Sequence, residues 1–253
     1  MRDRTAVVRV PEARAGRLKA LILAAGKGTR LGDLGSDTPK PMLPLAGRPL
    51  LEWTLESLRR AEIREVVINL HHAPRVIPDH FGDGSAFGLR IDYLVESEIL
   101  GTAGAVRNAR PLLDGAPFLV VYGDTVLDWD PRPMVADHVA ASAAATIVVA
   151  EVADPSLLGV VLFDAQRRIT TFVEKPGHRP ELGRWVNAGL CVLDRRVFDR
   201  IPETGFSDLG ASIFPAMLER GDLLRAYPRP RPLTVLDTPE QYAAAQRTWS
   251  LPA

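Results

Sequence analysis

The sequence predicts an α/β fold built on a mixed, mainly parallel sheet with helices on both faces and antiparallel additions. Two observations lead to this prediction. Up to about residue 150, short continuous apolar runs, typical of strands buried on both faces, alternate with helix-like segments. After residue 151, strand-like runs follow one another with short polar connections, which is typical of antiparallel strands.

The first half of the chain opens with a strand over 19–25 and a loop rich in glycine and proline over 26–49. A helix is expected over 50–61, because Leu51, Leu55 and Leu58 fall on one face. Beyond it, the patterns predict strands at 65–70, 91–95, 118–122 and 145–150, and helices at 102–110 and 133–144.

In the second half, strands are expected at 159–163, 169–173 and 185–193, with a short last strand at 233–236. A helix over 208–220 would begin at Asp208, a favourable N-cap residue, and end at Gly221. Thr238 can cap a terminal helix.

Composition excludes several classes of protein. The chain has 253 residues, of which 31 are basic and 31 acidic, whereas a nucleic-acid binder usually carries a basic excess. No apolar run reaches the roughly 18 residues that a membrane helix needs. We therefore expect no nucleic acid and no membrane among its partners. Cys191 is the single cysteine, so an intramolecular disulfide is excluded, which fits a cytoplasmic protein.

Residues 1–17 contain five arginines but no apolar core of a signal peptide. We interpret this segment as a disordered extension, with a basic contact arm as the alternative. No linker divides the remainder, so residues 18–253 are expected to form a single domain.

The segment with the strongest chemical signal is the loop after the first strand. Glycines let backbone N–H groups approach an anion and form a nest for phosphate. Arg30 and Lys40 add positive charge, and Pro39 and Pro41 stiffen the backbone around Lys40. The loop matches neither G-x-G-x-x-G nor the P-loop pattern, and a mobile surface loop is the alternative.

Other polar residues have a functional and a structural interpretation. Asp124 ends an apolar strand and is either a ligand or a turn residue, and Asp237 is either a ligand or a helix cap. Glu174 and Lys175 could be a solvated surface pair, and Asn187 a structural amide. Three other candidates are weaker. A loop or helix-start role explains His71 and His72 better than a metal pair does, Ser207 has no recognisable partner histidine, and Cys191 fits a core position.

Several of these segments occur together in the order of a known family. The stretches L-A-A-G-K-G-T-R-L and P-K-P-M resemble the N-terminal signature of sugar-1-phosphate nucleotidylyltransferases. Further motifs follow in the family's order: Glu96 with L-G-T-A-G-A at 100–105, G-D at 123–124, E-K-P at 174–176, N-A-G at 187–189 and D-T-P-E at 237–240. The resemblance covers residues 18–245 and is greatest to mannose- and heptose-1-phosphate guanylyltransferases.

This resemblance implies a Rossmann-like nucleotidyltransferase fold and a role for each matching residue. Arg30 and Lys40 would be catalytic, Asp124 and Asp237 would hold Mg²⁺, and Glu96 would shape the pocket near base and sugar. The sugar phosphate would be bound by Glu174, Lys175 and Asn187. The nucleotide would be bound by Leu23, Ala24, Ala25, Gly26, Gly28, Thr29, Gly101 and Thr102.

The sequence departs from the family's pattern in three places. Asp33 and Gly35 stand where the family often has Pro and Thr, which adjusts the loop without changing its basic residues. Asp237 lacks the tryptophan that often precedes it, which weakens its assignment to the metal. The chain leaves no room for the C-terminal β-helix domain of larger relatives, so we expect none.

The implied reaction joins a sugar 1-phosphate to a nucleoside triphosphate and releases pyrophosphate. A phosphate monoester has a second pKa near about 6, so the attacking oxygen is already ionised at neutral pH and no general base is required. Catalysis then rests on positioning and charge neutralisation.

The loop from Glu96 to Gly104 favours guanylyl transfer to a manno-configured hexose or heptose. The alternatives are a uridylyltransferase acting on an amino-sugar 1-phosphate, a non-catalytic sugar-nucleotide sensor, and a glycosyltransferase with Asp128 and Asp130 as its Asp-x-Asp motif. The sequence leaves the oligomeric state open, a homo-oligomer included.

Overall fold

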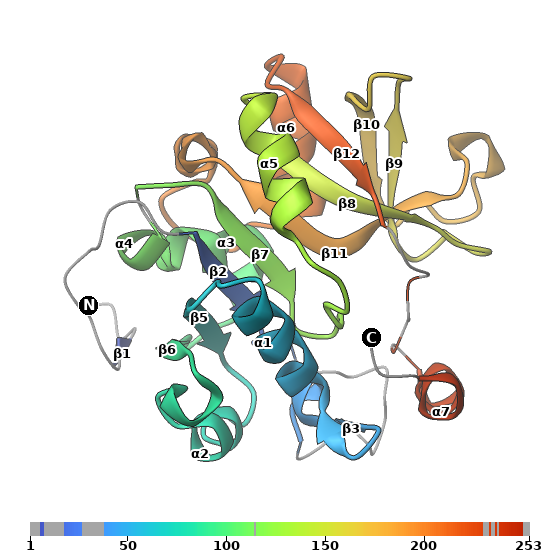
Figure 1. Ribbon diagram of the computed structural model, residues 1–253. Helices are drawn as coiled ribbons and strands as arrows, with labels where there is room; N and C mark the ends of the chain where they lie inside the picture. The colour runs from blue at the N-terminus through green and yellow to red at the C-terminus, as the bar shows by residue number, and fades with distance from the viewer. Residues whose placement is uncertain are drawn as a thin grey trace.

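The computed structural model describes residues 6–7, 18–26, 38–113, 115–229, 233, 236 and 238–249. In this part of the chain, a ten-stranded sheet forms the middle layer, and helices cover both of its faces (Figure 1). The sheet is mixed, with a parallel half and an antiparallel half. The predicted fold class is therefore confirmed.

The parallel half of the sheet consists of β6 (Arg90–Val95), β5 (Glu65–Leu70), β2 (Lys19–Leu23) and β7 (Phe118–Tyr122), in that spatial order. The chain runs from β2 to β5 and β6 on one side, and then returns to β7 on the other side of β2. Ligands in open α/β sheets bind outside the carboxyl ends of the strands at such a reversal of strand order. This topology directs attention to the segments that follow β2 and β7.

The antiparallel half begins with β11 (Trp185–Leu193), which lies between β7 and β8 (Ala145–Glu151) and runs antiparallel to both. The edge strand β12 (Leu224–Pro228) is parallel to β8. β9 (Gly159–Phe163) and β10 (Ile169–Glu174) form an antiparallel pair that joins β11 through β9. At the opposite edge, β1 (Ala6–Val7) pairs antiparallel with β6.

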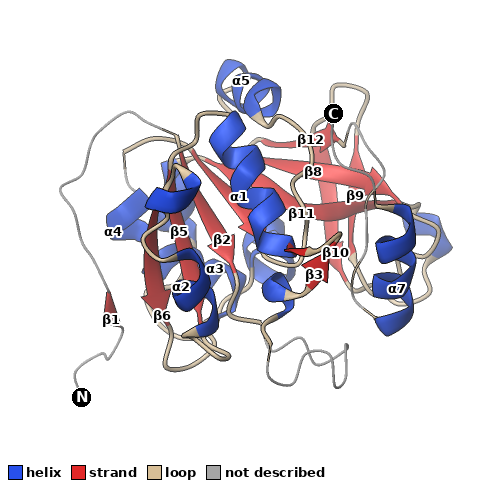
Figure 2. Cartoon of the chain, turned by 60° about the horizontal axis from the view of Figure 1, so that its bottom comes forward, coloured by secondary structure: helices blue, strands red, loops and turns tan. Residues whose placement is uncertain are grey.

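Each face of the sheet has its own hydrophobic core, because successive strand residues point to opposite sides. Leu21 belongs to the core under α3 (Gly101–Asn108), α4 (Arg110–Leu113) and α6 (Phe214–Glu219). Its neighbours Ala20 and Ile22 belong to the core under α1 (Leu50–Arg60), α2 (Val76–Phe81) and α5 (Arg132–Ala140) (Figure 2). The strand is thus buried on both faces, as its continuous apolar run predicted.

A smaller cluster holds the C-terminal helix α7 (Pro239–Thr248) against the short hairpin of β3 (Pro44–Leu45) and β4 (Arg48–Pro49). Trp53 and Trp249 pack together there, with ring centroids 6.0 Å apart. The side chain of Thr238 accepts a hydrogen bond from the Gln241 N–H, and the two form a capping box. The predicted cap of this helix is confirmed.

The structure corrects the predicted elements at three places. The expected helix at 208–220 is a π-helical turn, η6 (Leu209–Ile213), followed by α6. α5 ends at Ala140 instead of residue 144, because Ser142 adopts a positive φ of 51°. β12 was not predicted, and the strand expected at 233–236 lies partly outside the described residues, with Leu233 and Leu236 in no strand. Short 3₁₀ turns also occur at η2 (Lys40–Met42), η3 (Ser85–Phe87), η4 (Pro180–Leu182) and η5 (Arg195–Arg200).

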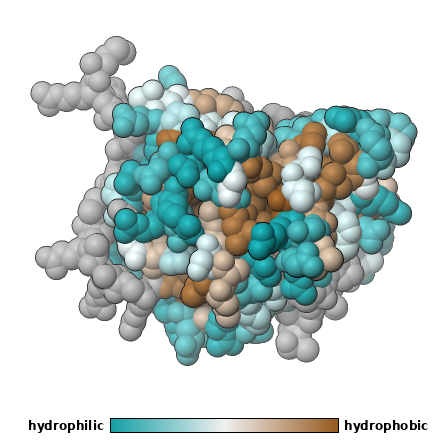
Figure 3. Space-filling model, turned by 90° about the horizontal axis from the view of Figure 1, so that it is seen from above, coloured by the Kyte–Doolittle hydropathy of each residue, from teal (hydrophilic) through white to brown (hydrophobic). Residues whose placement is uncertain are grey.

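The described helices are all too short or too polar to cross a lipid bilayer. On the face seen from above in Figure 3, hydrophobic residues form a band bordered by hydrophilic ones. Val139 of α5 is one of the large hydrophobic side chains exposed to solvent.

Candidate active site

The carboxyl ends of β2 and β7 meet at the switch point of the sheet. Leu23 lies beside Tyr122 in the parallel ladder, and the Gly123 N–H donates to the Leu23 carbonyl oxygen at 2.9 Å. Ala24, Ala25 and Gly26 continue from β2 into the glycine-rich loop. The described start of this loop therefore lies directly beside Gly123 and Asp124.

An ion pair joins the basic residue of the P-K-P-M segment to Asp124. Lys40 Nζ donates to Asp124 Oδ2 at 2.9 Å. The Lys40 side chain is only 9% exposed, whereas that of Asp124 is 38% exposed. The ammonium group is thus held in place beside a carboxylate that solvent and solutes can reach.

The close packing of this corner requires glycine at position 123. A Cβ atom there would lie 2.7 Å from the Leu23 carbonyl oxygen and 3.0 Å from Cγ of Pro41. Because Pro41 follows Lys40, the same contact brings the 3₁₀ turn η2 against the end of β2. Glycine at this position therefore lets Lys40 approach Asp124.

A buried hydrogen-bond network connects the ends of β2, β5 and β6. The Ala24 N–H donates to Asn69 Oδ1 at 2.8 Å, and Asn69 Nδ2 donates to Glu96 Oε1 at 2.8 Å. The other carboxylate oxygen of Glu96 accepts from the Leu100 N–H at 3.2 Å. Burial raises the pKa of the Glu96 carboxyl, although these two hydrogen bonds oppose the shift. Glu96 is only 3% exposed, so its carboxylate holds protein segments together.

The next loop, which begins α3, is fixed to the segment before η6. Gly101 has a φ of 78°, and a Cβ atom there would lie 2.3 Å from the Ser207 carbonyl oxygen. That carbonyl accepts hydrogen bonds from the N–H groups of Ala103 and Gly104 at 3.0 and 3.1 Å. Gly101 thus allows this loop to lie against the segment at 207 without a side chain between them.

The Thr102 hydroxyl forms two hydrogen bonds within the protein. It donates to Asp208 Oδ2 at 3.0 Å and accepts from the Leu209 N–H at 2.7 Å. Asp208 Oδ1 accepts from the N–H groups of Gly210 and Ala211, both at 2.9 Å, so its predicted role as an N-cap is confirmed. Thr102 therefore ties α3 to the start of η6.

The residues expected to bind the sugar phosphate lie near the ends of β10 and β11. Asn187 hydrogen-bonds the Tyr122 side chain, which places it beside the end of β7. Glu174 is half-buried; burial raises the pKa of its carboxyl, the Asp208 carboxylate adds to this shift, and Lys175 opposes it. Lys175 is exposed, and its Nζ lies 3.9 Å from Glu174 Oε1. Of the sugar-site candidates, Lys175 is the one that points to solvent.

Four predicted site residues lie outside the described part of the chain: Gly28, Thr29, Arg30 and Asp237. Within the described residues, no three His, Cys, Asp or Glu side chains group as a metal site. Asp124 alone still fits Mg²⁺ chemically, since this ion takes one or two carboxylates and completes its shell with phosphate oxygens and water. Its exposed carboxylate is therefore the described residue that could hold the metal.

Two residues at this edge were missed by the sequence analysis. Asn69 accepts from Ala24 and donates to Glu96, and its signal is a polar residue inside the apolar strand β5. Tyr122 contacts Asn187, and burial raises the pKa of its hydroxyl well above the ordinary value. Asp128, half of the Asp-x-Asp alternative, forms a buried ion pair with Arg229 at 2.6 Å, which disfavours a metal-binding role for it.

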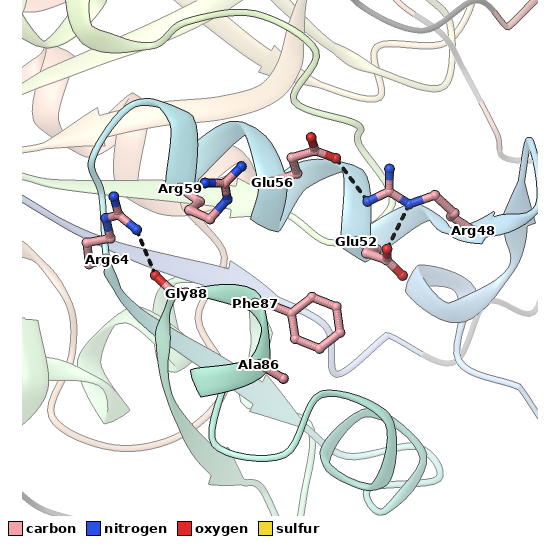
Figure 4. A pocket seen from close by; sticks show the side chains of 8 residues that line it. All are labelled: Arg48, Glu52, Glu56, Arg59, Arg64, Ala86, Phe87 and Gly88. Atoms are coloured by element: carbon pink, nitrogen blue, oxygen red, sulfur yellow. Dashed lines mark hydrogen bonds and ion pairs between the residues drawn. The ribbon is translucent and has the colours of Figure 1, made fainter.

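A separate pocket of about 470 Å³ lies along α1 opposite η3 (Figure 4). Most of its charged groups form hydrogen bonds with other groups of the protein. Arg48 donates to Glu52 and Glu56 at 2.7 and 2.9 Å, and Arg64 donates to the Gly88 carbonyl oxygen at 2.9 Å. None of the predicted site residues that the structure describes lines this pocket.

Most of the chain matches a known protein family. A family model described as nucleotidyl transferase matches residues 19–232. The mannose-1-phosphate guanylyltransferase of Mycobacterium tuberculosis is 37% identical over 206 residues, which cover 81% of this chain and 57% of that protein. The UTP–glucose-1-phosphate uridylyltransferase of Synechocystis sp. is 35% identical over 218 residues, covering 81% and 56%. The chain thus spans little more than half the length of these curated relatives.

Solved structures show the same architecture. HddC from Yersinia pseudotuberculosis has a TM-score of 0.78 at 25% identity, covering 92% of this chain and 100% of that one, and it has also been solved in complex with GMP-PN. A putative glucose-1-phosphate thymidylyltransferase from Bacillus anthracis has a TM-score of 0.81 at 25% identity, covering 91% and 94%.

Proposed function

The chain belongs to the nucleotidyl transferase family, and from that premise we propose that it transfers a nucleotidyl group from a nucleoside triphosphate to a sugar 1-phosphate, releasing pyrophosphate. The observation that carries the proposal is the ion pair of Lys40 with Asp124 at the switch point of the sheet. It combines a positioned cation for phosphate with an accessible carboxylate for a metal.

The reaction requires neutralisation of negative charge, because two polyanions must meet in line. Lys40 is held by Asp124 and by its neighbouring prolines, so its ammonium loses little freedom when phosphate binds. Arg30 would add a second positive charge to the departing pyrophosphate. The attacking phosphate oxygen is already ionised at neutral pH, and no residue needs to remove a proton.

Members of this family generally depend on a divalent metal, and Asp124 would hold Mg²⁺ here, together with Asp237. Bound Mg²⁺ would supply positive charge to the α-phosphate. The triphosphate would then be surrounded by backbone groups of Leu23, Ala24, Ala25, Gly26, Gly28 and Thr29. Gly101 would line the nucleotide site, and Thr102 would support it.

At the sugar side, Glu174 offers a carboxylate to which no described residue donates a hydrogen bond. A partly buried carboxylate is stabilised by a donor, and sugar hydroxyls are donors. Asn187 would contribute a second polar contact, and the exposed Lys175 would bind the sugar's phosphate.

We favour GTP and a manno-configured hexose or heptose 1-phosphate as the substrates. Support comes from the Glu96 to Gly104 loop and from relatives named mannose-1-phosphate guanylyltransferase. The uridylyltransferase among the relatives keeps UTP as the alternative nucleotide. A cytoplasmic location belongs to the same proposal, since the single cysteine offers no disulfide.

The test is pyrophosphate release by the full chain over a matrix of nucleoside triphosphates and sugar 1-phosphates with Mg²⁺. We expect turnover, fastest with GTP and mannose 1-phosphate or a heptose 1-phosphate. A dominant uridylyl activity would replace the nucleotide assignment and keep the reaction. The absence of turnover with every pair would reject the reaction and favour a non-catalytic sensor.

A further inference from the structure

The Glu174 carboxylate lies in a slot between two glycines from different elements. Gly159 faces Glu174 directly across the antiparallel pair of β9 and β10. A Cβ atom at Gly159 would lie 2.7 Å from Glu174 Oε2, and one at Gly210 would lie 2.6 Å from the same oxygen. Any larger residue at either position would displace the carboxylate.

Gly210 stands in η6, where the N–H groups of Ile213 and Phe214 each bond the carbonyl five residues earlier. Such π-helical turns are rare, and they occur frequently at functional sites. The turn brings Gly210 against the edge of the Phe172 ring, where a Cβ atom would lie 3.1 Å from Cε1. The wall of the slot therefore depends on the position of this turn.

Thr102 and Asp208 fix that position. Asp208 caps the turn through the Gly210 and Ala211 N–H groups, and the Thr102 hydroxyl bridges Asp208 and the Leu209 N–H. The hydroxyl is thus occupied by protein partners on both its donor and its acceptor side. A residue of α3, which follows the nucleotide-side loop, in this way reaches the sugar-side carboxylate through η6.

We propose that Thr102, Asp208 and Gly210 form a positioning device that sets the place of the Glu174 carboxylate and thereby selects the sugar of the sugar 1-phosphate. The inference rests on the proposed function. It adds the residues that fix the sugar site from outside it. Glu174 touches the sugar hydroxyls, and the other three act through it.

The kinetic test compares the apparent KM values for sugar 1-phosphate and for nucleoside triphosphate. Gly210→Ala pushes on Oε2 of Glu174, and we expect its KM for sugar 1-phosphate to rise about tenfold or more, the scale of a lost hydrogen bond to a charged group. The KM for the triphosphate should stay within about twofold. Thr102→Val should also raise the KM for sugar 1-phosphate, and Thr102→Ser, which keeps the hydroxyl, should restore the wild-type KM for sugar 1-phosphate.

Ala211→Gly is the matched control, because it weakens the same turn and adds no atom towards Glu174. For Gly210→Ala, a rise in the triphosphate KM equal to that for the sugar 1-phosphate, or an equal effect of Ala211→Gly, would overturn the positioning role.

A double-mutant cycle of Gly210→Ala with Glu174→Ala, measured by thermal unfolding, tests the contact without turnover. Coupling is expected, and additivity would overturn the slot. If the wild type released no pyrophosphate with any pair, the proposed function would fail, and the cycle would still decide whether the contact exists.

Discussion

Lys40 Nζ lies 2.9 Å from Asp124 Oδ2, and the two residues are 84 positions apart in the chain. Lys40 lies in the loop rich in glycine and proline that follows β2, and Asp124 follows β7. Their meeting depends on the switch of strand order between β2 and β7, and on Gly123, whose missing side chain lets Pro41 approach. The ion pair therefore gives the site a positioned cation and a carboxylate in one place.

We expect Lys40→Ala to lower turnover by at least about 10²-fold, the scale of losing one electrostatic stabiliser of a transition state. The measurement is pyrophosphate release at saturating substrates. Lys19→Ala is the matched control. Lys19 begins β2, at the end of the strand far from the site, where its Nζ lies 3.7 Å from Glu65 Oε2 and donates to the Leu112 carbonyl oxygen. Turnover by Lys40→Ala equal to that of Lys19→Ala would reject the catalytic role.

Asn69→Ala should lower both stability and turnover. The change removes the acceptor of the Ala24 N–H and the donor to Glu96, and it leaves buried polar groups without partners. Each such loss costs about 1–3 kcal/mol of the free energy of unfolding. Urea unfolding measures the stability, and pyrophosphate release measures the turnover.

Asn108→Ala is the control for this prediction, because the buried Asn108 Nδ2 has no hydrogen-bond partner in the part of the chain that the structure describes. We expect it to cost much less than Asn69→Ala. Similar losses in the two variants would show that the network contributes little.

The sequence predicted the parallel half of the sheet well because β2 and β7 carry continuous apolar runs, and the apolar runs of β5 and β6 are each interrupted by one polar residue, Asn69 and Asp92. Lys40 and Asp124 could also be predicted as site residues, since each belongs to a recognisable motif. Their contact could not, because it is made by segments distant in sequence. β12 was missed, since its residues Arg225 and Pro228 interrupt the apolar pattern of an edge strand.

Thr102 belongs to a recognisable motif, but the motif did not predict the hydrogen bonds that its side chain forms. The resemblance implies that it lines the nucleotide site, which stays a prediction, whereas its hydroxyl bonds Asp208 and Leu209. Those partners lie more than 100 positions away along the chain. The helix expected at 208–220 also hid Gly210, because a pattern of apolar residues does not distinguish a π-helical turn from an α-helix.

We expect His138 to make the free energy of unfolding depend on pH. It is 1% exposed, its Nδ1 lies 3.0 Å from Thr146 Oγ1, and burial lowers its pKa, an effect that Asp194 partly offsets and Arg196 reinforces. The unfolded chain takes up a proton near the ordinary value of about 6.5, while the folded chain stays neutral. Stability should therefore fall as pH drops from about 6.5 towards the lower folded pKa, by at most about 1.4 kcal/mol per pH unit.

His138→Gln removes the titrating group and should flatten the stability curve in this window. Chemical denaturation between about pH 5 and 7 measures the effect. The exposed His178 provides the control variant His178→Gln, which should keep the wild-type slope. Parallel curves for the wild type and His138→Gln would show that another group controls the pH dependence.

Gly101→Ala should destabilise the protein through two separable causes. Its φ of 78° costs an L-residue about 1–2 kcal/mol, and its Cβ atom would in addition lie 2.3 Å from the Ser207 carbonyl oxygen. Gly221→Ala isolates the first cause, because Gly221 has a φ of 76° and no atom within 4 Å of the added Cβ. The free energy of unfolding should therefore fall further in Gly101→Ala than in Gly221→Ala.

The Ser207 carbonyl also binds the first turn of α3, so only Gly101→Ala should raise the KM for the triphosphate. Equal losses of unfolding free energy in the two variants would show that the close approach of these two loops is not the reason for glycine at 101.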